Sequence, residues 1–229
     1  MNRRKLVLGA AAVGVVAFTG GSWVVRDRRD REIEAEAVAR AAAIPDLNTL
    51  LLRPAAPVLG PQDAPVTLVE FFDPSCEACR AYHPVLKQLR EQFPTQLRIV
   101  MRYAAFHEGS DQAVAMLEAA RRQGVFEQVL DALLERQPEW ALHDGPRVDL
   151  AWQIAEAAGL DTSNREVEMK FPSTVAILSQ DRADIEVLGV RATPTFFLNG
   201  RQLNDMNLQR LAAAVQTEVA ALDATGGDG

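Results

Sequence analysis

The apolar positions of the chain follow two different periods, and the strand-like runs lie on either side of a long helical middle. Residues 66–72 and 97–101 are almost wholly apolar, as expected for strands that are buried on both faces of a sheet. Residues 195–198 form a third apolar run, and Asn199 and Gly200 after it favour a tight turn into a further strand. The pattern therefore predicts one sheet built from two separated parts of the chain.

Between residues 110 and 182 no segment has the pattern of a strand. Apolar residues recur at helical spacing over 113–135, 148–158 and 166–181, and Ser110 is placed to cap the first of these helices. A last amphipathic helix is expected over 208–222. The order of these elements predicts an α/β fold with an all-helical insertion of about seventy residues.

The N-terminal segment has the features of an export signal or a membrane anchor. Residues 6–25 carry no charge and follow Arg3, Arg4 and Lys5, and such a segment is long enough to cross a bilayer as a helix. No cleavage motif of the Ala-x-Ala kind ends it. We expect residues 1–25 to remain on the protein as a single-pass anchor, and a cleaved signal is the alternative.

Residues 26–57 are expected to form a helical spacer and linker. Arg, Glu and Ala dominate residues 27–43 without a helix breaker, which favours an exposed helix. The alternative role of this helix is a short oligomerisation stalk. Five prolines between residues 45 and 65 mark the connection to the first strand, and residues 224–229 are expected to be a disordered tail.

The two cysteines of the chain, Cys76 and Cys79, stand three positions apart just after the first apolar run. A strand that leads into a helix opening with CxxC places the first sulfur at the helix N-terminus, where free N–H groups and the helix dipole stabilise a thiolate. The second sulfur lies one turn further on and is able to attack a mixed disulfide formed by the first. This spacing predicts a redox-active dithiol.

Two structural roles for the cysteines are less favoured. A zinc site would need about two more ligands, but the chain has no third cysteine and its three histidines are far apart in sequence. A disulfide closing so short a loop would constrain the unfolded chain very little. We therefore expect dithiol chemistry and no metal.

Composition and charge bound the function further. The chain is 48% hydrophobic and 24% charged, which is ordinary for a globular protein. Without residues 1–25, which include three basic residues and no acid, 21 basic residues face 31 acidic ones, a net charge of −10. Such a body does not bind nucleic acid by charge. With two cysteines in one motif, the fold must be held by its core.

Two motifs carry a family resemblance. Glu70, Phe71 and Phe72 followed by the CxxC motif resemble the active-site strand and helix of the DsbA-like thiol-disulfide oxidoreductases, and the segment from Thr193 to Gly200 resembles their cis-proline loop and hairpin strand. The resemblance covers about residues 58 to 223. It implies a thioredoxin fold formed by residues 58–108 and 186–223, with residues 109–185 as the helical insertion.

The resemblance also implies roles for individual residues. Cys76 would be the nucleophile that forms a mixed disulfide, and Cys79 would resolve it. Glu70 matches the buried acid of the family and would relay a proton to or from Cys79, although a carboxylate satisfied by a backbone donor is the structural alternative. Thr193 and a cis Pro194 would bind an extended substrate segment by backbone pairing.

The implied function is the exchange of disulfides with protein cysteines in the cell envelope, most simply as a DsbA-like oxidase. The catalytic domain would face the periplasmic or extracytoplasmic side of the cytoplasmic membrane. Its partners would be proteins with cysteines and a membrane redox partner, either a DsbB-like oxidase or a reductase, and no cofactor is expected.

Glu77 bears on the direction of the reaction. Its negative charge lies beside the expected thiolate, so it should raise the pKa of Cys76 relative to a CxxC that contains histidine. This keeps an oligomeric isomerase or a reductase open as alternatives to the oxidase. A function of a different class, a Cu(I)-binding dithiol module, also fits two sulfurs at this spacing.

Overall fold

The computed structural model describes residues 26–29, 31–32, 35–36, 38–39, 46–204 and 206–226. The chain divides into two units, residues 1–44 and residues 45–229. In the first unit, the described residues between 26 and 39 are helical and mostly exposed, in agreement with the expected exposed helix. The expected membrane span, residues 6–25, lies outside the described residues. Among the residues that are described, no helix combines the length and apolarity needed to cross a membrane.

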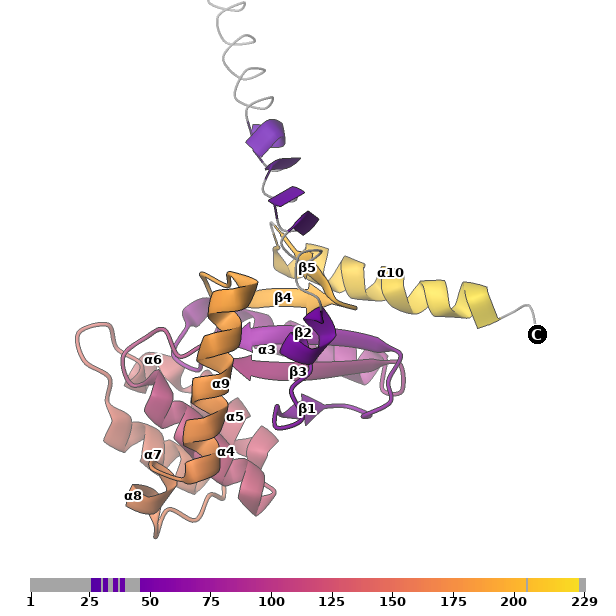
Figure 1. The fold of residues 1–229 in the computed structure, drawn as a ribbon. Helices are drawn as coiled ribbons and strands as arrows, with labels where there is room; N and C mark the ends of the chain where they lie inside the picture. Colours follow the sequence, from indigo (N-terminus) through magenta and orange to yellow (C-terminus); the bar gives the residue numbers. More distant parts are fainter. Residues whose placement is uncertain are drawn as a thin grey trace, which may run out of the picture. The chain divides into compact units, whose positions relative to one another are not determined.

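The second unit is built on a five-stranded mixed sheet in the order β1-β3-β2-β4-β5 (Figure 1). Central strand β2 (Val66–Phe72) pairs in parallel with β3 (Leu97–Tyr103) and antiparallel with β4 (Thr195–Leu198). The edges are β1 (Val58–Leu59) and β5 (Arg201–Leu203). Every residue of β2 except Thr67 is buried, which explains its continuous apolar run.

The β4–β5 turn has the backbone that its dipeptide favours. Asn199 and Gly200 both have positive φ, 48° and 82°, as a two-residue turn with the right-handed twist of a hairpin requires. Their register places Leu198 opposite Arg201. The hairpin predicted from the sequence is confirmed.

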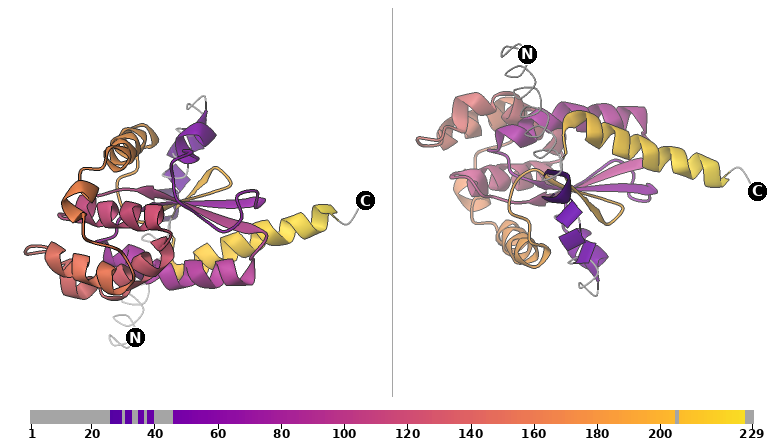
Figure 2. Two further views of the ribbon diagram at one scale, coloured as in Figure 1. Left: turned by 90° about the horizontal axis from the view of Figure 1, so that it is seen from below. Right: turned by 90° about the horizontal axis from the view of Figure 1, so that it is seen from above.

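Helices cover both faces of the sheet (Figure 2). Helices α3 (Glu77–Gln92) and α10 (Leu208–Gly226) pack together on one face, and α9 (Pro172–Leu188) and α2 (Leu47–Leu51) pack together on the other. The apolar side of α10 is buried as the sequence predicted, through Leu211, Val215 and Val219. Helix α10 continues to Gly226 and so enters the segment expected as a disordered tail, which is a correction to that expectation; residues 227–229 are outside the described residues.

The segment between β3 and β4 is helical in all its regular structure, as expected. It comprises α4 (Ser110–Gln123), α5 (Phe126–Glu135), α6 (Gln137–Trp140), α7 (Val148–Ala157), α8 (Arg165–Glu168) and α9. The predicted helix 113–135 is in fact two, because Gly124 ends α4 in a left-handed conformation at φ 77°. The predicted helix 166–181 is also two, since Pro172 begins a new one, α9.

The expected cap of the first inserted helix is wrong. Gly109 takes the N-cap position of α4, and Ser110 is the first helical residue. The Ser110 hydroxyl is fully buried and donates to the carboxylate of Asp73, 2.5 Å away. The side chain is therefore used to join the insertion to the loop that precedes the cysteines.

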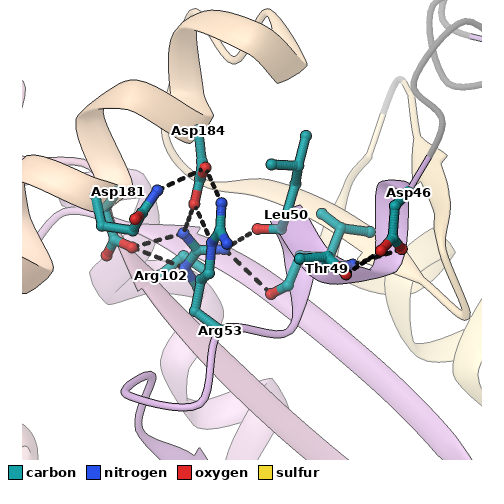
Figure 3. A network of polar contacts seen from close by, with 9 residues as sticks. Asp46, Thr49, Leu50, Arg53, Arg102, Asp181 and Asp184 are labelled. Carbon is teal, nitrogen blue, oxygen red and sulfur yellow. Dashed lines mark hydrogen bonds and ion pairs between the residues drawn. The ribbon is translucent and has the colours of Figure 1, made fainter.

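A buried network of charges joins β3 to α9 and α2 (Figure 3). The guanidinium of Arg102 on β3 is inaccessible to solvent and donates to Asp181 and Asp184 of α9 at 2.6 Å each. Arg53, after α2, also donates to Asp184, at 2.7 and 2.8 Å. The remaining Arg102 donors reach the carbonyl oxygens of Leu50 and Leu51. Two arginines thus face two aspartates, so the buried charges compensate one another.

Candidate active site

The two cysteines lie where β2 passes into α3. Strand β2 ends at Phe72, residues 73–75 form a tight turn, and Cys76 is the N-cap residue of α3. Both cysteines are free thiols, and Cys76 is 6% exposed against 1% for Cys79. The structure therefore describes the reduced form of the dithiol, with the first sulfur at the helix N-terminus as predicted.

The environment of Cys76 strongly favours its thiolate. The pKa of Cys76 is lowered from 9.0 to about 5, chiefly because the Cys79 thiol donates a hydrogen bond to its sulfur. The Thr193 side chain and the backbone N–H groups of Cys79 and Ala78 act in the same direction, and burial opposes them. These groups are the free donors of a helix N-terminus together with one neighbour from another element. Cys76 is thus ionised at neutral pH.

Cys79 is in the opposite state. Burial raises its pKa far above the ordinary value, and the hydrogen bond to Cys76 and the negative charge that Glu70 carries once it is ionised add to this effect. The backbone N–H of Asp73 lies 3.5 Å from the Cys79 sulfur. The pair therefore consists of one thiolate and one protonated, buried thiol.

Glu70 lies in the centre of β2, opposite Phe196 of β4 and Met101 of β3. It is 2% exposed, and its buried Oε1 has no hydrogen-bond partner among the described residues. Burial, with the negative charge of Cys76, raises the pKa of Glu70 to about 8. The structure thus gives no support to the alternative in which a backbone donor satisfies this oxygen, and it leaves a protonated acid near Cys79.

The second predicted motif lies beside the first, because β4, which it precedes, pairs with β2. The bond between Thr193 and Pro194 is cis, as the resemblance implied, and it precedes β4 directly. The carbonyl oxygen of Thr193 lies 3.3 Å from the sulfur of Cys76. The fold therefore brings together residues that are 117 positions apart in the chain.

Asp73 organises the turn before the cysteines, and sequence reasoning missed it. Its carboxylate is completely buried and accepts hydrogen bonds from the backbone N–H of Ser75 at 2.8 Å and the hydroxyl of Ser110. It also accepts from the backbone N–H groups of Phe106 and His107, and its Oδ2 lies 2.7 Å from Nδ1 of His107. One carboxylate therefore fixes the cysteine turn, the loop after β3 and the start of α4 relative to one another.

Gln137 of α6 holds the same turn from the helical insertion. Its buried amide donates to the carbonyl oxygens of Pro74 at 2.8 Å and Cys76 at 3.0 Å. Its own carbonyl accepts from Nε of Arg80 on α3. The insertion thus contacts the active-site backbone directly.

Glu77 has partners that the sequence did not suggest. One oxygen lies 2.7 Å from Nε2 of His143, and both side chains are largely exposed. The pKa of Glu77 is lowered, first by a hydrogen bond to its own backbone N–H and further by His143 and His107. His143, which lies far from the CxxC motif in sequence, is therefore its neighbour in the fold. The expected effect of Glu77 on the Cys76 pKa stays a prediction.

Comparison with known proteins decides the family. Residues 53–217, most of the chain, match a family model described as Thioredoxin. The chain belongs to the thioredoxin family. It is also 31% identical to a thioredoxin-like oxidoreductase from Silicibacter pomeroyi DSS-3, with a TM-score of 0.64 over 76% of this chain and 97% of that one. The helical segment between β3 and β4 agrees with the insertion expected from the sequence.

Two other relatives show how far the likeness extends. The thiol-disulfide exchange protein α-DsbA2 from Wolbachia pipientis shares the fold, with a TM-score of 0.66 and 19% identity over 80% of this chain and 97% of that one. A Na(+)/H(+) antiporter NhaA from Herminiimonas arsenicoxydans is 34% identical over 174 residues, which are 74% of this chain and 27% of the antiporter. The chain spans about a third or less of the curated relatives it matches first.

The site residues predicted from the sequence lie close together in the structure. The residues that hold them in place, such as Asp73, were not predicted. Cys76, Cys79, Glu70, Thr193 and Pro194 all lie around the start of α3. Asp73 stands three residues before the first cysteine. Its structural role follows from its burial and its hydrogen-bond partners, and neither can be seen in the sequence. Within the described part of the chain, no group of three or more His, Cys, Asp or Glu residues is arranged to hold a metal ion.

Proposed function

We propose that this protein oxidises cysteine pairs of other proteins by thiol–disulfide exchange. The observation that carries the proposal is the asymmetry of the dithiol, in which the pKa of Cys76 is about 5 and that of Cys79 is far above its ordinary value. A stabilised Cys76 thiolate lowers the free energy of the reduced form, and this makes the disulfide form a stronger oxidant. It also makes Cys76 the better leaving group.

The proposed reaction begins with the oxidised protein. A substrate thiolate attacks Sγ of Cys76, the Cys76–Cys79 bond breaks, and Cys79 leaves as a thiolate that takes up a proton. A second substrate thiolate then attacks the substrate sulfur of the mixed disulfide and releases Cys76 as a thiolate. The substrate loses two electrons and two thiol protons and gains a disulfide, and the protein gains the two electrons.

Glu70 and the cis-proline loop have supporting roles in this proposal. Glu70 is protonated at neutral pH, and once ionised its charge acts on Cys79 from nearby, which supports a role as the proton donor to the leaving Cys79 sulfur. The Thr193 carbonyl oxygen beside Cys76, in the loop that leads into β4, supports binding of a substrate segment by backbone pairing. Glu77 would tune the thiolate, together with the histidines that face it.

The test of this function uses single-cysteine variants of the full chain. Cys79→Ala should accumulate mixed disulfides with substrate proteins, because its Cys76 thiolate still attacks substrate disulfides and breaks their S–S bond, but Cys79 is no longer there to attack Sγ of Cys76 and release the substrate. Cys76→Ala is the matched control and should accumulate none. Trapping by both variants, or by the second alone, would overturn the assignment of the nucleophile.

Two activity assays separate the oxidase from its alternatives. The oxidase should oxidise a reduced two-cysteine peptide rapidly and should refold a protein with scrambled disulfides poorly. Efficient refolding by a dimer or trimer, lost when residues 27–43 are deleted, would favour the oligomeric isomerase, since two sites facing one substrate help shuffling.

We also propose that the protein is tethered to the cytoplasmic membrane by residues 6–25, with the catalytic unit on the periplasmic or extracytoplasmic side. The length and apolarity of this segment support the tether. A membrane redox partner, a DsbB-like oxidase or a reductase, would then restore the active form. The full chain should sediment with membranes and resist extraction at high salt, whereas a shortened soluble form in the envelope fraction would contradict the tether.

A further inference from the structure

The start of α3 holds more negative than positive groups. Cys76 is a thiolate, Glu77 is its sequence neighbour, and the buried carboxylate of Asp73 lies three residues before it. A thiolate beside two carboxylates is costly unless a cation lies nearby. Among the groups that act on the ionisation of Glu77, the candidate cations are His107 and His143.

His107 is the histidine that the fold holds in place. Its backbone N–H and its Nδ1 both bond to Oδ2 of Asp73, at 3.1 and 2.7 Å, and the side chain is 36% exposed. The same Asp73 carboxylate accepts from the backbone N–H of Ser75, one residue before Cys76. The ring is therefore tied to the cysteine turn through a single rigid acceptor, and its Nε2 is not needed for that bond. His143, in contrast, is 78% exposed and contacts Glu77 from a loop.

Resting on the proposed thiol–disulfide function, we propose that His107 is a positioning residue that tunes the dithiol: held by Asp73, its imidazolium stabilises the Cys76 thiolate and offsets Glu77. The charged groups that act on the ring are Asp73, Cys76 and Glu77, and all three are negative. They raise the pKa of His107 above its ordinary value, although burial of the ring acts against them.

This coupling has a definite direction and is reciprocal. Reduction creates the Cys76 thiolate, so the reduced protein should bind a proton at His107 more tightly than the oxidised protein does. By linkage, protonated His107 should make the disulfide a stronger oxidant by the same factor. For a partly exposed ring we expect this factor to be about three- to tenfold. The effect should be full between the pKa of Cys76, about 5, and the pKa of His107, where both the thiolate and the imidazolium are present, and it should vanish above the pKa of His107.

The first experiment measures the proton affinity of His107 in both redox states of the full chain. Hydrogen–deuterium exchange at Cε1 of the imidazole, read by mass spectrometry across a pH series, reports the ionisation of each histidine separately. The exchange midpoint of His107 should lie at higher pH in the reduced protein than in the oxidised protein. His83 is the internal control, because its charged neighbours are Asp131, Lys87 and Arg90 and do not include Cys76. Equal midpoints for His107 in the two states would overturn the proposal.

The second experiment uses variants that keep the hydrogen bonds and remove the charge. His107→Asn places an amide where Nδ1 bonds to Asp73, and His83→Gln places one where Nε2 bonds to Asp131. The equilibrium constant for oxidation of glutathione should be about three- to tenfold lower in His107→Asn at about pH 6, where Cys76 is ionised and His107 is protonated, and should approach the wild-type value at high pH. His83→Gln should follow the wild type throughout.

A purely structural role for His107 predicts a different result. The ratio of the glutathione equilibrium constants of His107→Asn and wild type would then not change with pH. That outcome would also overturn the proposal. Failure of the proposed function is distinguishable, because a protein that traps no substrate through Cys76 would still reveal the coupling of His107 to the dithiol in the exchange experiment.

Discussion

Glu70 is a carboxylic acid in the middle of a buried strand, and burial raises its pKa from 4.5 to about 8. Between these two values the folded protein holds a proton on Glu70 that the unfolded chain has lost. The unfolded state therefore binds fewer protons, and the free energy of unfolding falls as the pH rises from about 4.5 to 8. Above pH 8 both states are ionised at this position, and the fall ends.

Glu70→Gln should remove this dependence, because the amide does not titrate. The free energy of unfolding of the variant minus that of the reduced wild type should be about 3–5 kcal/mol more favourable to the variant at pH 8 than at pH 4. Denaturant unfolding at the two pH values measures it, with exposed Glu91→Gln as the control. If wild type and Glu70→Gln keep a constant difference, the raised pKa of Glu70 is wrong.

The residues that could be predicted from the sequence are those with a local signal. Cys76 and Cys79 are identified by spacing, and Glu70 and Pro194 by short motifs that resemble a family. Asp73, His107, His143 and Gln137 carry no such signal, since their partners are set by the packing of distant segments. Glu77 illustrates the consequence: the sequence showed its place beside Cys76, but not that His143 contacts it or that His107 acts on its ionisation.

Helix α6 is short, yet it positions the dithiol. Gln137 donates two hydrogen bonds to the backbone of the cysteine turn, and both carbonyl acceptors lie in buried surroundings. Loss of the donor leaves those oxygens unsatisfied and frees the turn that aligns the N–H groups of Ala78 and Cys79 on the thiolate. The helical insertion thus contributes to the chemistry as well as to the core.

Gln137→Met keeps the volume of the side chain and removes its donor. We expect a loss of about 1–3 kcal/mol in the free energy of unfolding and a higher pKa of Cys76. The pH dependence of alkylation at Cys76 measures the second effect, with exposed Gln88→Met of α3 as the control. An unchanged alkylation profile would show that α3 aligns its donors without help from α6.

At the scale of elements, the sequence predicted strands better than helix ends. Strands β2 and β4 have the expected bounds because their apolar runs are interrupted by turn residues at both ends. The structure breaks two of the predicted helices, at Gly124 and Pro172. Both residues are known helix breakers, but the apolar spacing continues past them, and this spacing predicted a single helix in each case. Ser110 resembled a cap in sequence, and a buried partner on another element took its hydroxyl instead.

At the scale of the whole molecule, the buried ion network shown in Figure 3 joins β3 to α9 and to the segment around α2. Arg102 is inaccessible, and its loss would leave Asp181 without a cation and Asp184 with Arg53 alone. Burial already raises the pKa of Asp181 in spite of Arg102. The network was not predictable from the sequence, because Arg102 and Asp181 are 79 positions apart.

Arg102→Met should destabilise the fold by about 3–5 kcal/mol, the usual cost of leaving a buried charge uncompensated. Arg102→Met combined with Asp181→Asn should be less destabilised than the sum of the two single changes, because the pair is then removed together. Denaturant unfolding of the three variants measures the coupling. Exact additivity would contradict an interaction between these two side chains.

The central claim is that a stabilised Cys76 thiolate makes this protein an oxidant. The most direct measurement is the redox equilibrium of the full chain with glutathione at pH 7, followed by the fraction of alkylated Cys76. The stabilised thiolate predicts a reduction potential of roughly −120 to −180 mV, towards the oxidising end of the family's range. A potential near roughly −270 mV, as in a reductase, would contradict the claim.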